Sequence, residues 1–121
     1  MNKKILENAQ KYCNDEIFKE GSNFYYSFLH LEKREKDAIS STLSFYKKVY
    51  GISNNSKDKD LNLIKLNWWK KEISNTYNDK PSHPISIAMK CAIQNFGIEK
   101  KLFMNIIKGV HLELNKNISI I

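Results

Sequence analysis

Arginine is almost missing from this sequence: Arg34 is its single example, and lysine supplies every other cationic side chain. The planar guanidinium of arginine is the usual group for reading phosphates and bases, because it forms two hydrogen bonds at once. The 20 Lys and Arg against 13 Asp and Glu give a net charge of +7, which is compatible with an anionic partner. Since the lysines are scattered rather than clustered, we predict that nucleic acid is not among the partners.

Cysteine and long apolar runs are also scarce. Cys13 and Cys91 stand alone, without the paired spacing of a zinc site or a disulfide framework, so we interpret both as packing residues. The apolar runs are a few residues long, far from the roughly 20 that a membrane-spanning helix needs. Near the amino terminus, Glu7, Asn8 and Gln10 interrupt the apolar stretch that a signal peptide requires. A cytoplasmic location is therefore the expectation.

Strand-like alternation is missing too, and the apolar residues recur at helical spacing instead. The loop signals are a Gly-, Ser- and Asn-rich segment at 51–59, two prolines at Pro81 and Pro84, and Gly97 as a helix C′ residue. The chain is long enough for one modest core, so we predict a single all-α domain over residues 1–121 with about five to six helices. The periodic segments are 5–17, 22–31, 38–49, 61–77, 85–96 and 102–110.

Three stretches of the sequence stand out together. They are SNFYYSFL at 22–29 leading to AI at 38–39, LNWWKKEI at 66–73 leading to PSHPI at 81–85, and FGI at 96–98 leading to IIKGVHLEL at 106–114. Each stretch alone has little specificity, because an aromatic stripe is usually core. In this order and with this spacing they resemble the squalene/phytoene synthase family over roughly residues 20 to 114. The resemblance implies the N-terminal part of the helical isoprenoid synthase fold.

In that family the helix after the first stretch carries an aspartate-rich motif, with carboxylates at its first, second and fifth positions. Carboxylates at this spacing share a helix face and hold the Mg²⁺ that bridges to the substrate diphosphate. The matching positions here are Tyr50, Gly51 and Asn54, and none of them is acidic. Asn54 offers one neutral carbonyl oxygen. We therefore expect no catalytic residue, no metal site and no cofactor; Mg²⁺ enters only if the chain is an enzyme after all.

The third stretch departs from the family in the same direction. His111 and Glu113 stand where the family usually has two acidic residues beside its glycine, and the chain ends before the place of a second aspartate-rich motif. The short connection between Phe45 and Trp68, together with the Trp-Lys-Lys sequence, is more similar to the family's non-catalytic branch. That branch includes a mitochondrial assembly factor for respiratory complex I.

The resemblance also implies candidate ligand contacts. Phe24, Tyr25, Phe28 and Phe45 match helices of the substrate cavity and would line a prenyl-binding cavity, and Lys47 matches a basic position that contacts diphosphate. Each has an ordinary alternative. Aromatic side chains dominate protein cores, and a lysine on a helix usually keeps its ammonium group in water.

Two further features have structural interpretations. Trp68 and Trp69 are adjacent on one predicted helix and point about 100° apart, so we expect one in the core and the other at a boundary, at a protein or membrane interface. His83 is expected to fix a turn or cap the next helix, because no partner is positioned for acid–base work. His30 and His111 lack companions at metal-ligand spacing, and we interpret them as structural.

Three hypotheses about function remain open on these residues. The leading one is a non-catalytic family member that binds a protein partner or an isoprenoid lipid, with attachment to a membrane surface left open. The second is a Mg²⁺-dependent prenyl-diphosphate transferase of the squalene/phytoene synthase type, acting with a missing C-terminal half that a second polypeptide supplies. The third is the remnant of a synthase gene, whose product exposes helix faces that the absent half once covered.

Overall fold

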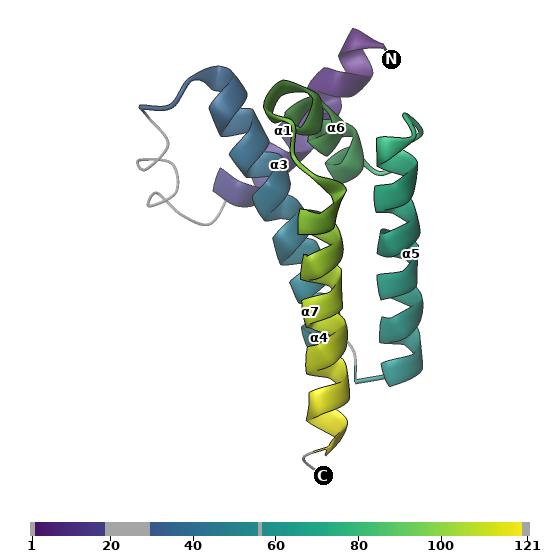
Figure 1. The fold of residues 1–121 in the computed structure, drawn as a ribbon. Helices are drawn as coiled ribbons and strands as arrows, with labels where there is room; N and C mark the ends of the chain where they lie inside the picture. Colours follow the sequence, from purple (N-terminus) through teal and green to yellow (C-terminus); the bar gives the residue numbers. More distant parts are fainter. Residues whose placement is uncertain (1, 19–29, 56, 120–121) are drawn as a thin grey trace.

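The computed structural model describes residues 2–18, 30–55 and 57–119, except for the side chains of residues 53, 55 and 115–119. Within these ranges the chain forms helices and no strand, which confirms the all-α prediction (Figure 1). None of the described helices is both long and apolar enough to cross a membrane. The helices are α1 (Lys3–Phe18), α3 (Lys33–Tyr50), α4 (Ile52–Asn55), α5 (Lys59–Tyr77), α6 (Pro84–Phe96) and α7 (Lys100–Ser119).

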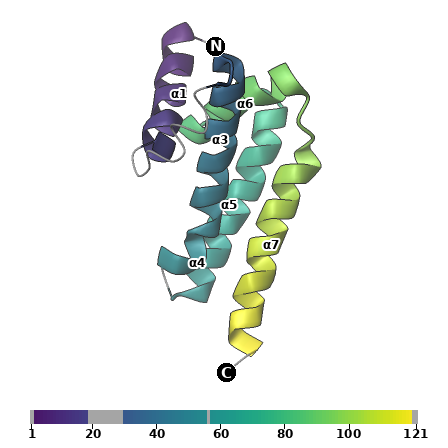
Figure 2. The same ribbon diagram turned by 90° about the vertical axis from the view of Figure 1, so that its left-hand side faces the viewer.

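The helices form two groups that share α3. Helices α3, α5 and α7 make up the long body of the molecule, and α1 and α6 pack against α3 at one end of it (Figures 1 and 2). Helix α6 also contacts α5, and α7 contacts both α3 and α5. The amino terminus lies at the end where α1 and α6 cross, and the carboxyl terminus lies at the opposite end.

The helix boundaries follow from capping residues. The carboxylate of Glu35 accepts a hydrogen bond from the backbone N–H of Glu32 (3.0 Å) at the start of α3, and Asp58 accepts one from Leu61 N (3.2 Å) at the start of α5. Gly97 ends α6 in the left-handed region at φ +63°, as its expected C′ role requires. The helices expected over 5–17, 38–49, 61–77, 85–96 and 102–110 are thus all confirmed, and the one over 22–31 lies almost wholly outside the described residues.

The prediction of a loop over 51–59 was wrong in part, because Ile52–Asn55 form the single turn α4. Gly51 adopts ordinary right-handed helical angles (φ −70°, ψ −13°) rather than the left-handed ones that would reverse the chain. The Asn54 N–H donates to Gly51 O (3.0 Å), and Ile52 is only 5% exposed. Burial of this one apolar side chain offsets the poor helix propensity of its Gly, Ser and Asn neighbours.

The core is centred on Phe45 of α3, which is completely buried. Its ring meets the edges or faces of Trp69 from α5 and Phe103 from α7, with ring centroids 5.7 Å and 5.4 Å away and interplanar angles of 81° in both cases. Such edge-to-face pairs add to the apolar area that the rings already bury. The three long helices are therefore joined at one point. The other buried apolar side chains around it include Val49, Leu66, Ile73, Ile85, Met89, Ile107 and Val110.

The two cysteines are free thiols, in agreement with their interpretation as packing residues. Cys13 of α1 is fully buried in the core, and Cys91 is partly buried. Burial raises the pKa of the Cys13 thiol to about 11, and the hydrogen bond with Ser44 only partly opposes this. The Cys13 side chain is therefore an uncharged, unreactive thiol at neutral pH.

We predict that Phe45→Ala lowers the free energy of unfolding by about 3–5 kcal/mol, because it removes the ring that contacts both α5 and α7 and leaves a cavity. Tyr46→Ala, at the neighbouring and half-exposed position, is the matched control and costs less than about 1 kcal/mol. Urea unfolding followed by circular dichroism measures both. Equal losses in the two variants would show that Phe45 is not the centre of the core.

Candidate functional site

The three positions that match the aspartate-rich motif fall where α3 ends. Tyr50 is the last residue of α3, Gly51 is its C-cap, and Asn54 belongs to α4. The Gly51 N–H donates to Lys47 O (3.0 Å), which closes the last turn. The ring of Tyr50 stacks on that of Tyr46, with centroids 5.6 Å apart. In place of one acidic helix face, this region has a helix terminus and a pair of stacked phenols.

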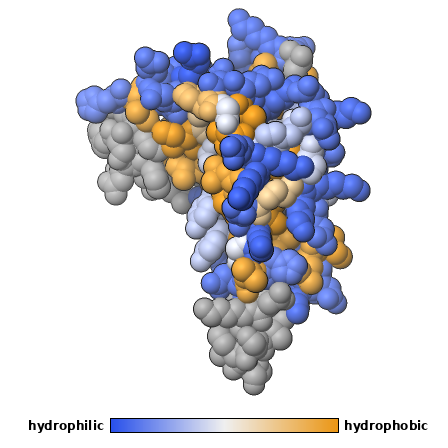
Figure 3. All heavy atoms as spheres, viewed as in Figure 1, coloured by the Kyte–Doolittle hydropathy of each residue, from blue (hydrophilic) through white to orange (hydrophobic). Residues whose placement is uncertain are grey.

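The stacked tyrosines continue an apolar stripe along the outer side of α3. Ile39, Leu43, Tyr46 and Tyr50 follow one another at spacings of four, three and four residues, so they share one helix face. Tyr46 and Tyr50 are each 47% exposed, and Ile39 and Leu43 are partly buried. Figure 3 shows apolar residues gathered over the upper half of α3 on one face of the molecule.

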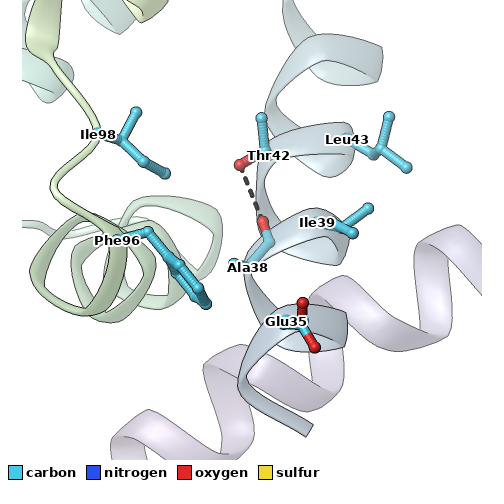
Figure 4. Close-up of a pocket in the computed structure, with 7 residues that line it drawn as sticks. All are labelled: Glu35, Ala38, Ile39, Thr42, Leu43, Phe96 and Ile98. Carbon is cyan, nitrogen blue, oxygen red and sulfur yellow. Dashed lines mark hydrogen bonds between the residues drawn. The ribbon is translucent and has the colours of Figure 1, made fainter. Parts of the chain in front are cut away.

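An apolar groove runs beside the first half of this stripe. Its volume is about 350 Å³, near the lower end of the roughly 300–1,000 Å³ typical of ligand sites. Phe96 and Ile98 form one wall and point toward α3, which forms the other (Figure 4). The α3 residues that line the groove are Glu35, Ala38, Ile39, Thr42 and Leu43.

The two polar side chains that line the groove already form hydrogen bonds with the protein backbone. The hydroxyl of Thr42 donates to Ala38 O (2.9 Å), and the carboxylate of Glu35 accepts from the Glu32 N–H. Both contacts stabilise α3 itself. The groove therefore presents mainly carbon atoms to a ligand, which suits an apolar chain or an apolar helix face and offers no acid–base pair for chemistry.

The wall opposite α3 is held in place by its own contacts. Gly97 turns the chain between the two wall residues, Phe96 and Ile98, through its left-handed backbone. The hydroxyl of Tyr77, at the end of α5, donates to Ile98 O (2.6 Å). Burial, and secondarily the negative charge of Glu99, raises the pKa of Tyr77, so this hydroxyl keeps its proton and remains a donor at neutral pH.

Of the candidate ligand contacts, the two within the described residues, Phe45 and Lys47, do not line the groove. Phe24, Tyr25 and Phe28 lie outside the described residues. Phe45 lies in the core between α5 and α7. Lys47 is exposed and borders a separate cavity of about 180 Å³ next to α1. Their roles as contacts to a prenyl chain or a diphosphate remain predictions.

The comparisons with known proteins agree with the resemblance in the sequence. The sequence model of the family described as squalene/phytoene synthase matches residues 17–119. The chain belongs to this family. No solved structure gives a significant match.

The curated relatives are distant and much longer. NADH dehydrogenase (ubiquinone) complex I, assembly factor 6 from Bos taurus is 24% identical over 82% of this chain and 30% of its own, and the Homo sapiens protein is 23% identical over 79% and 29%. Presqualene diphosphate synthase from Rhodopseudomonas palustris is 22% identical over 81% and 35%. This member of the squalene/phytoene synthase family thus spans about a third of the length of the curated relatives it matches.

The second stretch of the family resemblance, which includes the two tryptophans, has a clear structural role. Trp69 is 4% exposed and packs on Phe45, whereas Trp68 is 45% exposed, as the 100° rotation between them predicts. His83 is the N-cap of α6, where its Nδ1 accepts a hydrogen bond from Ile85 N (3.0 Å). The expected capping role of His83 is therefore confirmed, and its imidazole lies against Trp69 with centroids 5.0 Å apart.

Glu72 was missed by the sequence reasoning, although it connects the two halves of that stretch. Its side chain is 2% exposed, and its carboxylate accepts hydrogen bonds from Ser82 N (2.7 Å), Ser82 Oγ (2.9 Å), His83 N (2.9 Å) and the hydroxyl of Ser86. The signal was an acidic residue on the buried face of α5, between Trp69 and Thr76. A buried carboxylate needs such donors, because desolvation alone would be costly.

The pKa values of this cluster have definite directions. Burial alone would raise the pKa of Glu72, but the donors from Ser86, His83 and Ser82 outweigh it and hold the pKa below its ordinary 4.5. For His83, burial and the positive charge of Lys48 lower the pKa below 6.5, against the opposing charge of Glu72. Both groups therefore bind protons more weakly in the folded state than in the unfolded state.

This sign fixes the pH dependence of stability. A group whose pKa is lower in the folded state than in the unfolded state stabilises the fold at pH values above its unfolded-state pKa. This stability is lost as the pH falls through the folded-state pKa. We predict that the protein loses stability on acidification, first through His83 below about pH 6.5 and then through Glu72 below about pH 4.5. Urea unfolding measured between pH 3 and pH 8 tests this; a free energy of unfolding that rises toward pH 4 would contradict it.

Glu72→Gln isolates the second contribution. We expect it to lower the free energy of unfolding by about 2–3 kcal/mol at pH 7, because charged-acceptor hydrogen bonds are lost and a buried amide must point its NH₂ at donors. The gap between the variant and the original protein narrows as the pH falls below about 4.5, where Glu72 itself becomes protonated. Glu113→Gln, an exposed position on α7, is the control and changes stability little at either pH. A gap that does not change with pH would argue against an ionised Glu72.

Proposed function

We propose that this chain is a non-catalytic member of the squalene/phytoene synthase family that acts by binding, as part of a protein assembly. The observation that carries the proposal is the identity and placement of Tyr50, Gly51 and Asn54 at the end of α3. In the family's catalytic members, the matching positions hold a metal ion with carboxylates. In this chain the three positions carry the phenol of Tyr50, a glycine without a side chain and the neutral amide of Asn54.

The local charge opposes a divalent cation as well. Mg²⁺ is bound in proteins by carboxylates together with substrate phosphates, and neutral oxygens alone rarely replace them. Lys47 and Lys48 lie in the last turn of α3 and add positive charge beside the motif positions. The positive charge of the two lysines would repel a metal cation bound at the motif positions. Under this proposal the protein uses no metal cofactor.

The apolar groove supplies the means of binding. The first half of α3 forms one side of it, and Phe96 and Ile98 form the other. Its two polar side chains already form hydrogen bonds with the backbone at α3. The similarity to complex I assembly factor 6 of cattle and humans supports a protein as the occupant. The groove also fits an isoprenoid lipid, whose branched chain is entirely apolar.

The second candidate function is a prenyl-diphosphate transferase. The specific observation in its favour is the similarity to presqualene diphosphate synthase. Since the chain spans about a third of that relative, the missing carboxylates would have to come from a further polypeptide segment. In that arrangement the groove would hold the prenyl chain, and Lys47, which borders a separate cavity, would contact the diphosphate outside the groove.

A thermal melt separates the two functions. A non-hydrolysable farnesyl diphosphate analogue is added with and without Mg²⁺, because a ligand that binds the folded state raises the melting temperature by mass action. We predict no increase that depends on Mg²⁺. An increase that needs both additions would support the transferase and contradict our proposal. An increase with the analogue that is the same with and without Mg²⁺ would identify an isoprenoid as the occupant and leave the protein non-catalytic.

A variant with restored carboxylates is the matched control for this melt. Tyr50→Asp, Gly51→Asp and Asn54→Asp together return negative charge to the motif positions. We expect Mg²⁺ to raise the melting temperature of this triple variant and to leave that of the original protein unchanged. If Mg²⁺ stabilises the original protein equally, the substituted motif is not what prevents metal binding.

A further inference from the structure

A basic cavity lies on the side of the molecule where α3, α5 and the start of α6 meet. It has a volume of about 300 Å³, and it shares no lining residue with the apolar groove. The positions of the substituted aspartate-rich motif do not line it either. Its lining residues are Lys48, Ile52, Lys65, Trp68, Trp69 and His83.

The charges around this cavity are unbalanced. Two of the six lining residues, Lys48 and Lys65, are cationic, and none is acidic. Neither lysine forms an ion pair within the described part of the chain. Two cationic side chains from different helices thus line one cavity that no acidic side chain lines, which favours an anionic ligand.

His83 adds a neutral hydrogen-bond donor to the cavity wall. Its Nδ1 accepts from Ile85 N, so the neutral ring carries its proton on Nε2. The described residues provide no hydrogen-bond acceptor for this N–H. The titratable groups that face His83 are Tyr12 of α1, Lys48 of α3 and Glu72 of α5.

Glu72 does not neutralise the cavity. It is 2% exposed, and its two oxygens already accept hydrogen bonds from Ser82, His83 and Ser86. It does not line the cavity. Its carboxylate therefore fixes the backbone that presents His83 and leaves the lysines available to a ligand.

The rest of the wall is apolar. Trp69 and Ile52 are 4% and 5% exposed and form the buried part of the wall, while the indole of Trp68 is 45% exposed. The rings of Trp68 and Trp69 lie at 87° to one another, with centroids 5.0 Å apart. An inorganic anion alone would leave the exposed part of the Trp68 indole in water, so the cavity favours an anion that carries an apolar or aromatic body.

We propose that the basic cavity binds a phosphate or carboxylate group carried on an apolar body, with Lys48, Lys65 and His83 holding the oxyanion and Trp68 covering the apolar part. The site is separate from the apolar groove and needs no metal ion. Two sources carry this chemistry: a free amphipathic anion and the headgroup of an anionic lipid. The proposal does not depend on the function proposed above.

Phenyl phosphate is the soluble probe, with inorganic phosphate beside it. Histidine ring signals in an NMR titration report on the site directly, and His30 and His111 serve as internal controls in the same spectrum. We expect phenyl phosphate to shift the His83 signals saturably and to raise the pH at which His83 titrates, while the other two histidines stay unchanged. Inorganic phosphate is expected to do the same more weakly.

Paired double variants test the role of the lysines. Lys48→Gln with Lys65→Gln weakens phenyl phosphate binding about tenfold or more, since two charge-assisted contacts are lost. Lys70→Gln with Lys71→Gln removes the same charge from α5 outside the cavity and leaves the affinity within about a factor of two. Equal weakening by both pairs would mean that net charge, rather than the cavity, attracts the probe, and would overturn the proposal.

Vesicles distinguish the two sources. A lipid headgroup is identified if the protein sediments with phosphatidylglycerol vesicles and not with phosphatidylcholine vesicles. This sedimentation must also be lost in the Lys48 and Lys65 double variant. A saturable His83 response to phenyl phosphate without such sedimentation identifies a free ligand. The absence of both responses would refute the proposed site.

Discussion

The burial of Phe45 between Trp69 and Phe103 is the interaction on which the rest of this structure depends. These rings come from α3, α5 and α7, and they join the three long helices at one point in the core. Once Phe45 points inward, the 3.6-residue period turns Ile39, Leu43, Tyr46 and Tyr50 to the outside of α3. The apolar stripe and the groove beside it are therefore consequences of how the core is packed.

Glu72 fixes the second important geometry, the start of α6. Its carboxylate accepts hydrogen bonds from three donors between the two prolines and from the Ser86 hydroxyl in the first turn of α6, and so holds α6 against α5. This one buried charge places His83 on the wall of the basic cavity, and it sets the direction of α6 toward the apolar groove. The family stretch that includes Trp69, Glu72 and His83 is thus a structural unit, which explains how it persists in a chain whose aspartate-rich motif is substituted.

Periodicity and capping signals were sufficient to predict most of the helices, because apolar spacing and residues such as Gly97 act locally. The divergent exposures of Trp68 and Trp69 and the cap at His83 were predictable for the same reason. The single turn α4 was not, since it depends on the burial of Ile52 against distant residues. The role of Glu72 and the basic cavity were not predictable either, because both arise where α3, α5 and α6 meet in space. Of the candidate ligand contacts, Phe45 lies in the core and Lys47 does not line the groove, and their contacts with a prenyl chain and a diphosphate stay predictions.

The central claim for this protein is that it keeps the core of the family fold and binds a partner without catalysis, because its metal-binding positions are substituted. The most direct measurement is the release of diphosphate from labelled farnesyl diphosphate, with Mg²⁺ present and the full chain at a concentration equal to that of the substrate. We predict no release above that of a sample without protein, because under our proposal Tyr50, Gly51 and Asn54 hold no metal ion against the leaving group. Release that requires Mg²⁺ and is lost in Lys47→Gln would contradict the claim and establish the protein as a prenyl transferase.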